Sequence, residues 1–465
     1  MAYYLKNIGL IILGAFILCA PAFYNGYPMV YSDTGSYIES GFTGIVPIDR
    51  PLGYGLFIRH SSMAFSLWFT VYAQTLILSS MLFLFLREVI KPKEKFPLFF
   101  ILIILALTTY TGIGWYAGQI MPDNFAPLLL LSILCLLYLK KINLFSALFV
   151  SLVFILACIT HYSHILLSLI VSSLLLSYFG YLKLRKKNNL FLFKRALVVC
   201  GLSLVSFLFV LTLNYAHGSG FRLGKGGHVF LMAHFIETGT MKEFLNEKCK
   251  TPEYENCKMC TYKDSLENAS MSFLWRQGST FSKMGGWESP RVEKEFNFLI
   301  SEMLSEPNYL VKNAFCSFRM GCTQLFLNSV GEGLPSYNKG TSPYIIVEKR
   351  FPNELSTYLN SRQNVNNGLV VWTDKINDWQ INLLLFTTVV LLFFFFTDKT
   401  DKQFYKLIAF IVFLVLLNGF LNAGINTPYS RLQCRVVWLL PMCAFVILIN
   451  KKKEIIQTCK TIFLK

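Results

Sequence analysis

Residues 196–215 read ALVVCGLSLVSFLFVLTLNY, a run of 20 residues without a charged side chain. A helix of about this length crosses the hydrocarbon core of a bilayer. Nine further apolar runs lie at 8–22, 63–86, 97–113, 125–139, 143–160, 165–181, 379–397, 405–424 and 434–450. With 54% hydrophobic and 15% charged residues, the chain is expected to be an all-α integral membrane protein with about ten transmembrane helices.

Lys and Arg are distributed unequally among the segments between these runs, and positive charge near helix ends is retained on the cytoplasmic side. With the N-terminus inside, the inner segments hold 21 Lys and Arg, whereas the short outer loops hold four: Arg50, Arg59, Arg431 and Arg435. We therefore expect a multi-pass protein of the bacterial inner membrane with both termini cytoplasmic. The net charge of +17 reflects this topology, and no basic patch with interleaved aromatic residues suggests nucleic-acid binding.

This topology divides the chain into three parts. They are an N-terminal membrane domain of about seven helices (1–215, with a first outer loop at 23–62), an extracytoplasmic domain between helices seven and eight (216–378), and a C-terminal membrane domain of about three helices (379–465). The outer domain is expected to be mainly helical, because Ser289-Pro290 is a typical helix start and apolar residues follow at helical spacing. Ala20-Pro21-Ala22 resembles a signal-peptide cleavage site, but we expect the first helix to be retained because it delivers the first outer loop.

Five of the twelve cysteines face an oxidising compartment in this topology: Cys249, Cys257, Cys260, Cys316 and Cys322. Some of them are expected to form disulfides, although the odd number leaves one over and the connectivity stays open. Cys257-Lys-Met-Cys260 also has the spacing of a zinc site, the weaker alternative because no second pair of ligands follows closely.

The first outer loop carries a dense group of polar side chains, Tyr31-Ser-Asp33-Thr-Gly-Ser-Tyr37. An ionised carboxylate near hydrocarbon costs about 2.5 to 3.5 kcal/mol on insertion scales, so such groups are often functional or paired. Asp33 is therefore a candidate catalytic residue, with hydroxyls around it that could orient a carboxylate or a sugar. The alternative is a helix N-cap or an Asx-turn in which Asp33 accepts hydrogen bonds from nearby amides.

Arg50 precedes Pro51 and the sequence Gly53-Tyr54-Gly-Leu-Phe57, which leads into the second helix. A guanidinium beside a stiff turn suits bidentate binding of a phosphate. Two alternatives remain open, an Arg that reaches lipid headgroups or one that pairs with Asp49.

His161-Tyr-Ser-His164 forms a tight turn between two helices at the outer surface. The two rings could bind a donor phosphate or a metal, or supply a proton. The alternative is a pair of interfacial side chains that bond to headgroups or to loop carbonyls.

A D-x-x-x-Y motif after the first helix, followed by R-P-x-x-Y-x-x-F before the second, resembles bacterial membrane glycosyltransferases of the GT-C superfamily. The matching residues are Asp33, Tyr37, Arg50, Pro51, Tyr54 and Phe57. Fainter matches are Met121-Pro-Asp123-Asn, Glu306-Pro-Asn-Tyr-Leu310 and Tyr429-Ser-Arg431. The large outer domain departs from the family pattern.

The resemblance implies a GT-C-like fold and transfer of a sugar from a polyprenyl-phosphate-linked donor to an extracytoplasmic glycan, lipid or protein. Asp33 would take the proton of the acceptor hydroxyl, and direct displacement would invert the anomeric carbon. The donor phosphate or substrate would be bound by Arg50, Tyr37, Tyr54, Asp123, His161, His164 and Arg431. A divalent ion, Mg²⁺ or Mn²⁺, could take part, held by Asp33, Asp123 and His164.

Three other functions fit parts of the sequence. An O-antigen-type polymerase or ligase would use Arg222, Lys225 and His228 of the outer domain. A flippase or transporter of lipid-linked sugars would need no base, but the runs lack the clearly mid-helix charges typical of transporters. A membrane-bound acyltransferase would use the outer histidines.

Overall fold

The computed structural model describes residues 2–140, 142–186, 190–365, 368–397, 401–425, 427–452 and 454–456. Each apolar run forms a helix, and these residues contain no β-strand, so the all-α prediction is confirmed. The helices of the membrane part are α1 (Ala2–Leu18), α5 (Leu67–Val89), α6 (Phe96–Tyr110), α8 (Phe125–Tyr138), α9 (Leu144–Thr160), α10 (Tyr162–Leu184), α11 (Leu190–Ala216), α21 (Val370–Thr397), α22 (Lys402–Ile425), α23 (Ser430–Val437) and α24 (Leu439–Asn450).

Within the described ranges, six stretches of helix are long and apolar enough to cross a membrane. They are Leu67–Val89, Tyr162–Leu184, Leu190–Ala216, Thr373–Thr397, Lys402–Gly424 and Ser430–Asn450. Three apolar helices of 10–17 residues accompany them, Leu5–Leu18, Pro122–Tyr138 and Leu144–Thr160. The chain is thus built as a multi-pass membrane protein, and the number of ten spans stays a prediction.

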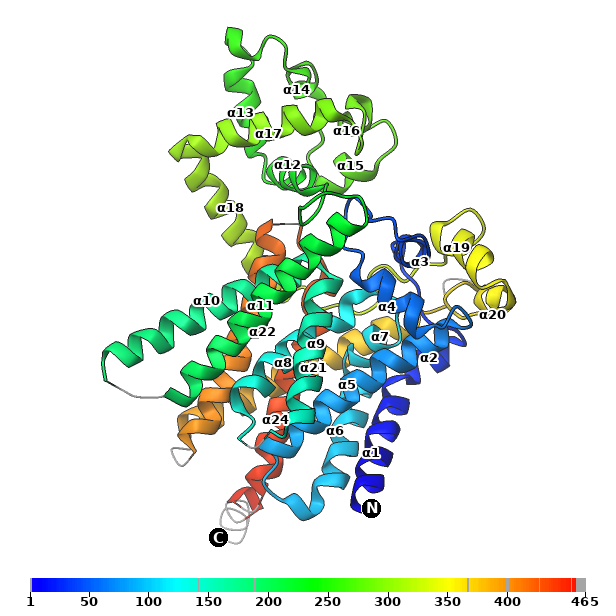
Figure 1. Ribbon diagram of the computed structural model, residues 1–465, viewed down its shortest axis with the longest axis vertical. Helices are drawn as coiled ribbons and strands as arrows, with labels where there is room; N and C mark the ends of the chain where they lie inside the picture. Colours follow the sequence, from blue (N-terminus) through cyan, green and yellow to red (C-terminus); the bar gives the residue numbers. More distant parts are fainter. Residues whose placement is uncertain are drawn as a thin grey trace.

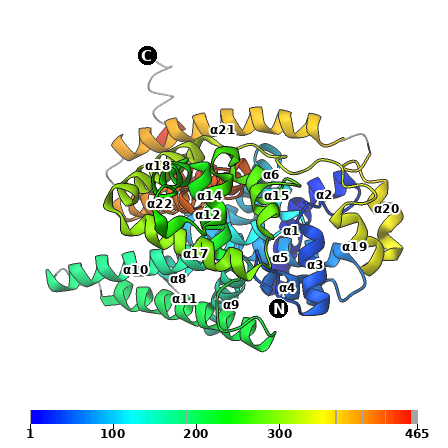
Figure 2. The same cartoon turned by 90° about the horizontal axis from the view of Figure 1, so that it is seen from above.

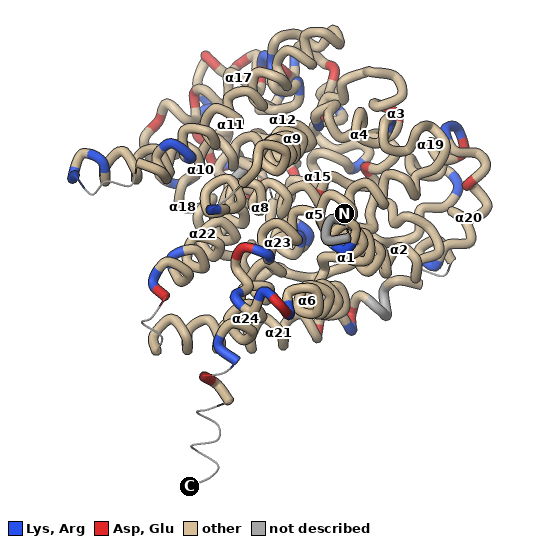
Figure 3. The backbone as a smooth tube through the Cα atoms, turned by 60° about the horizontal axis from the view of Figure 1, so that its bottom comes forward, with Lys and Arg blue, Asp and Glu red and all other residues tan. Residues whose placement is uncertain are grey.

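The membrane part has two different ends (Figure 1). The start of α1 lies at the same end as the connection between α5 and α6 and the start of α22, and helices α12 to α18 stand at the opposite end. Lys and Arg gather where α1, α10, α22 and α24 reach the first end (Figure 3). Residues 457–465, the last part of the basic C-terminal segment, lie outside the described residues.

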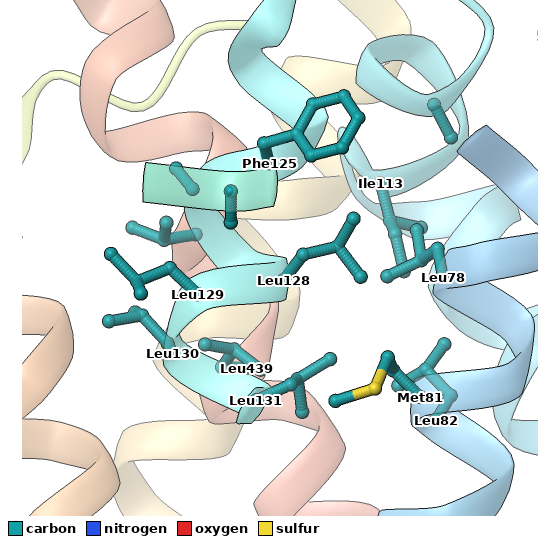
Figure 4. Close-up of a cluster of buried hydrophobic side chains, with 14 of the residues drawn as sticks. Leu78, Met81, Leu82, Ile113, Phe125, Leu128, Leu129, Leu130, Leu131 and Leu439 are labelled. Atoms are coloured by element: carbon teal, nitrogen blue, oxygen red, sulfur yellow. The ribbon is translucent and has the colours of Figure 1, made fainter. Parts of the chain in front are cut away.

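The packing of the bundle centres on α8. Leu128 to Leu131 of this helix are all fully buried, and they contact α5 and α24 through residues such as Leu78, Met81 and Leu439 (Figure 4). Seen from above, α10 and α11 lie side by side along one edge, and α21 lies along the opposite edge (Figure 2). Because α8 is surrounded by other helices, the short turn at its start is also held inside the protein.

The outer domain has a hydrophobic core of its own. Its helices are α12 (Gly227–Glu237), α13 (Thr240–Lys248), α14 (Lys258–Tyr262), α15 (Ser270–Trp275), α16 (Thr280–Met284), α17 (Pro290–Ser305) and α18 (Pro307–Phe326). Phe244, Phe273 and Phe296 are buried at its centre. The hydroxyl of Ser289 caps α17 by accepting a hydrogen bond from the Val292 amide, as the sequence predicted.

The outer cysteines form one disulfide, between Cys249 and Cys260. Cys257, Cys316 and Cys322 are free thiols. Since Cys260 is bonded to Cys249, it is not available to bind zinc with Cys257, and the zinc alternative is wrong.

The chain returns to the first outer loop after α18. This returning segment carries α19 (Ser342–Arg350) and α20 (Leu355–Leu359), which lie beside α2 (Ala20–Asn25) and α3 (Thr34–Thr43) in Figures 1 and 2. Gln363 exchanges two hydrogen bonds with the backbone of Val30, at 3.0 and 2.8 Å. The region predicted as one outer domain therefore contains a helical domain and a separate segment that holds the first outer loop.

Two glycines allow α3 to pack against α4 (Gly53–Ser61). A Cβ atom on Gly41 would lie 2.0 Å from the carbonyl oxygen of Gly55. We expect Gly41→Ala to lower the free energy of unfolding by about 1 to 3 kcal/mol, because backbone has to move to admit the methyl group. Thermal unfolding in detergent measures this effect. Gly9→Ala is the control, since nothing lies within 4 Å of that position, and an equal loss in both variants would contradict the expectation.

Candidate functional site

Asp33 lies directly before α3, but its side chain makes no capping hydrogen bond. Its Oδ2 atom lies 3.3 Å from Nη1 of Arg50, and the side chain is 29% exposed. The hydroxyl of Ser32 donates to Oδ1 at 3.3 Å. The N-cap alternative is thus wrong for this side chain, which combines an ion pair with access from solvent.

All three nitrogen atoms of the Arg50 guanidinium group bond to residues of the first outer loop. Nε donates to Oδ1 of Asp49 at 3.0 Å, Nη2 bonds to the other oxygen of Asp49, and Nη1 meets both the carboxylate and the carbonyl of Asp33. Burial lowers the pKa of Arg50, but Tyr37, Asp33 and Asp49 more than offset this and raise it above its usual range. The pairing with Asp49 is confirmed, and little of the guanidinium is left to bind a phosphate.

Tyr37 and Tyr54 support Arg50 from the protein interior. The guanidinium lies 4.9 Å from the centre of the Tyr37 ring, a cation–π contact. Tyr37 meets Tyr54 edge to face with ring centres 5.1 Å apart, and the Tyr54 hydroxyl donates to Gln74 at 3.3 Å. Both tyrosines are buried, so a direct contact of either with substrate stays a prediction.

Asp123 forms the centre of a second cluster, in the short turn η2 (Pro122–Asn124) before α8. Its side chain is only 3% exposed, and Oδ1 accepts a hydrogen bond from Nη1 of Arg435 at 2.8 Å. Arg431 approaches Oδ2 to 3.9 Å. Both arginines lie on α23, where a spacing of four residues places them on one face.

Arg435 is the residue that the site prediction missed. From the sequence, Arg435 was expected among the outer basic residues, but it was not expected to lie beside Asp123. Its side chain is 1% exposed, and Nη2 also donates to Asn422 at 3.3 Å. The signal that could have found it is its position one helical turn after Arg431.

Several buried polar atoms of this second cluster have no hydrogen-bond partner. They are Nε and Nη1 of Arg431, Nε of Arg435 and Nε2 of His164. The Arg431 guanidinium lies 4.4 Å from the centre of the Tyr31 ring, while its backbone amide donates to Glu332 at 2.9 Å. A buried donor without a partner costs about 1 to 3 kcal/mol, so the arginine N–H groups favour a ligand that accepts hydrogen bonds. Nε2 of His164 is an acceptor, because Nδ1 of this ring donates to a carbonyl.

His161 and His164 border the second cluster, with their ring centres 5.2 Å apart. Nδ1 of His161 accepts a hydrogen bond from the Ser163 amide at the start of α10. Nδ1 of His164 donates to the carbonyl of Ala157 at 2.8 Å, which belongs to helix α9 and not to a loop, and His164 is fully buried. Burial and then His164, Arg435, Arg431 and Arg50 hold the pKa of His161 well below its usual range, so its imidazole is neutral at pH 7.

The two clusters belong to one site because the loops that carry them are joined. The backbone of Met29 bonds to Gly118 and Ile120, at 3.1 and 2.8 Å. The Thr34 hydroxyl donates to the carbonyl of Ile120 at 3.0 Å. Arg431 accordingly interacts electrostatically with both Asp123 and Asp33. The structure thus brings together residues that the sequence places almost 400 positions apart.

The three proposed metal ligands do not form a metal site in this structure. Among the described residues, no group of three or more His, Cys, Asp or Glu side chains is placed to hold a metal ion. Asp123 bonds to Arg435 instead, and Asp33 pairs with Arg50. The ends of the guanidinium groups occupy the positions at which a cation would neutralise these carboxylates.

A groove of about 490 Å³ lies in the outer domain. It is lined by α17 and by the segment 253–257 before α14, through residues that include Cys257, Arg291 and Phe298, and none of the predicted site residues lines it. Arg222, a residue of the polymerase alternative, pairs with Glu293 at 3.7 Å.

No protein-family model, curated protein or solved structure matches the chain.

Proposed function

We propose that this chain is a GT-C-like membrane glycosyltransferase that transfers a sugar from a polyprenyl-phosphate-linked donor to an acceptor on the extracytoplasmic side. The observation that carries the proposal is the presence, within one site, of a solvent-accessible carboxylate and of buried guanidinium N–H groups that have no hydrogen-bond partner. A base and an anion-binding group are what displacement of a lipid phosphate by a hydroxyl requires.

Asp33 takes the proton of the acceptor hydroxyl, a step worth about 10² to 10⁴ in rate. The hydroxyl oxygen forms the new glycosidic bond, and the bond between the anomeric carbon and the phosphate oxygen breaks. The phosphate leaves as an anion and needs no proton. Direct attack inverts the anomeric carbon.

Arg431 and Arg435 stabilise the departing phosphate, because their free N–H groups lie in a buried site where a charge-assisted hydrogen bond is strong. This assignment moves the phosphate from Arg50 to the second cluster. Arg50 instead positions Asp33, since its donors are already used by Asp33 and Asp49. His161 and His164 line the side of the same cluster.

The proposed topology has ten spans in a bacterial inner membrane, with both termini cytoplasmic. It is supported by the Lys and Arg that mark one end of the bundle, opposite the outer domain (Figures 1 and 3). The outer domain and the returning segment then stand on the acceptor side, and the returning segment contacts the first outer loop at Gly35, two residues after Asp33.

Donor turnover in proteoliposomes tests the proposal. Radiolabelled polyprenyl-phosphate hexoses and pentoses are supplied one at a time with an extract of envelope glycans and lipids. We expect release of polyprenyl phosphate together with label in a new glycosidic bond for one of these donors. Movement of an intact lipid-linked sugar across the bilayer, with no phosphate released, would instead identify a flippase.

A further inference from the structure

Helix α18 leaves the outer domain and packs antiparallel against the end of α22. A Cβ atom on Gly321 would lie 2.3 Å from the ring of Phe420, and one on Gly419 would lie 2.9 Å from Leu325. Closer to the start of α18, Ser317 lies opposite Gly424. Small residues that let two helices approach closely are typical of packing within membranes.

The partner in this contact belongs to a membrane-spanning stretch. Lys402–Gly424 is long and apolar enough to cross the bilayer, and Gly419 to Gly424 form its last turn and a half. The part of α18 beside them, from Ser317 to Phe326, therefore lies at the depth of the outer leaflet. Ten residues of helix rise about 15 Å, which is about half of the hydrocarbon thickness.

One face of α18 carries a continuous apolar stripe. Its residues are spaced by four, three, four and four positions, and they are Val311, Phe315, Phe318, Cys322 and Phe326. Phe315 and Phe326 are 67% and 84% exposed. The ring of Phe318 stacks on that of Phe420 at 5.6 Å, so the stripe continues the outer surface of α22.

We propose that the second half of α18 is inserted in the outer leaflet and that its stripe contacts lipid acyl chains. Lipid is the expected partner of the stripe, because the stripe is continuous with a membrane-spanning helix that acyl chains surround at the same depth. Hydropathy along the sequence does not reveal the insertion, because the other faces carry polar residues. Asn313 and Gln324, for example, face inward, where they are buried.

The inserted helix is tied to the candidate site. Gln324 donates to the carbonyl of Tyr429 at 2.8 Å and accepts from the Tyr429 amide at 2.9 Å. Tyr429 stands two residues before Arg431. The inference itself does not depend on the proposed reaction.

Photolabelling of the full chain in lipid nanodiscs tests the insertion. A phosphatidylcholine with a diazirine near the middle of one acyl chain is activated, and adducts are mapped by mass spectrometry. We expect adducts at Phe318 and Phe326, at least tenfold above those at Phe298. This residue is the matched control, because it is an exposed phenylalanine on α17 of the outer domain.

A water-soluble diazirine reagent gives the complementary result. It should label the surface around Phe298 and leave the inserted part of the stripe, Phe318, Cys322 and Phe326, unlabelled. Equal labelling of the stripe and Phe298 by the lipid reagent would overturn the proposal. So would labelling of the stripe by the water-soluble reagent, or protection of the stripe from both reagents, which would indicate a protein partner.

Discussion

Asp33→Asn is expected to lower donor turnover by at least about two orders of magnitude. Asparagine has the same shape as aspartate and can still accept a hydrogen bond from Arg50, but it cannot remove a proton from the acceptor hydroxyl. The protein should therefore accumulate and unfold much as the unchanged chain does. The measurement is release of polyprenyl phosphate from the active donor in proteoliposomes.

Glu39→Gln provides the matched control for this prediction. Glu39 lies on α3, which Asp33 directly precedes, and the two side chains have a similar exposure. Glu39 forms ion pairs with Lys349 and Arg350 at 2.8 Å. We expect its replacement to leave donor turnover within about twofold, because exposed ion pairs contribute about 0 to 1 kcal/mol. Near-normal turnover in Asp33→Asn would remove the proposed base. An equal loss in both variants would show that the effect is structural.

The helices and the first cluster could be predicted because their signals are local. Long apolar runs determine where the helices form, whatever the rest of the chain does. Asp33, Asp49 and Arg50 belong to one loop, so that their proximity could be expected from the sequence. Whether Asp33 caps the helix that follows it could not be decided from the sequence, because the answer depends on the position of Arg50.

The second cluster could not be derived in the same way because it is made by contacts across the whole chain. Asp123 and Arg435 are 312 positions apart, and no local pattern pairs them. The same holds for Gln363 and Val30, which join the returning segment to the first outer loop. The proposed insertion of α18 likewise depends on a contact across the chain, the packing of this helix against α22.

The pair of Asp123 and Arg435 is expected to dominate the stability of the site. Arg435→Met leaves the Asp123 carboxylate buried with only Arg431, at 3.9 Å. Asp123→Asn leaves Arg435 buried without its ion-pair partner and Arg431 with only the more distant charge of Asp33. Removing one partner of a buried pair costs about 3 to 5 kcal/mol. Each single variant should therefore unfold at a clearly lower temperature in detergent.

The double variant Asp123→Asn with Arg435→Met separates stability from function. The double variant removes both charges and leaves neither one buried without its partner. It should therefore unfold at a higher temperature than either single variant, because the stability losses of two mutations at residues in contact do not add. Donor turnover should nevertheless stay low, since the Arg435 donors that meet the phosphate are absent. If the losses of stability simply added, the pair would not be coupled. If the double variant regained turnover, Arg435 would have served only to neutralise Asp123, and the phosphate would bind through Arg431 alone.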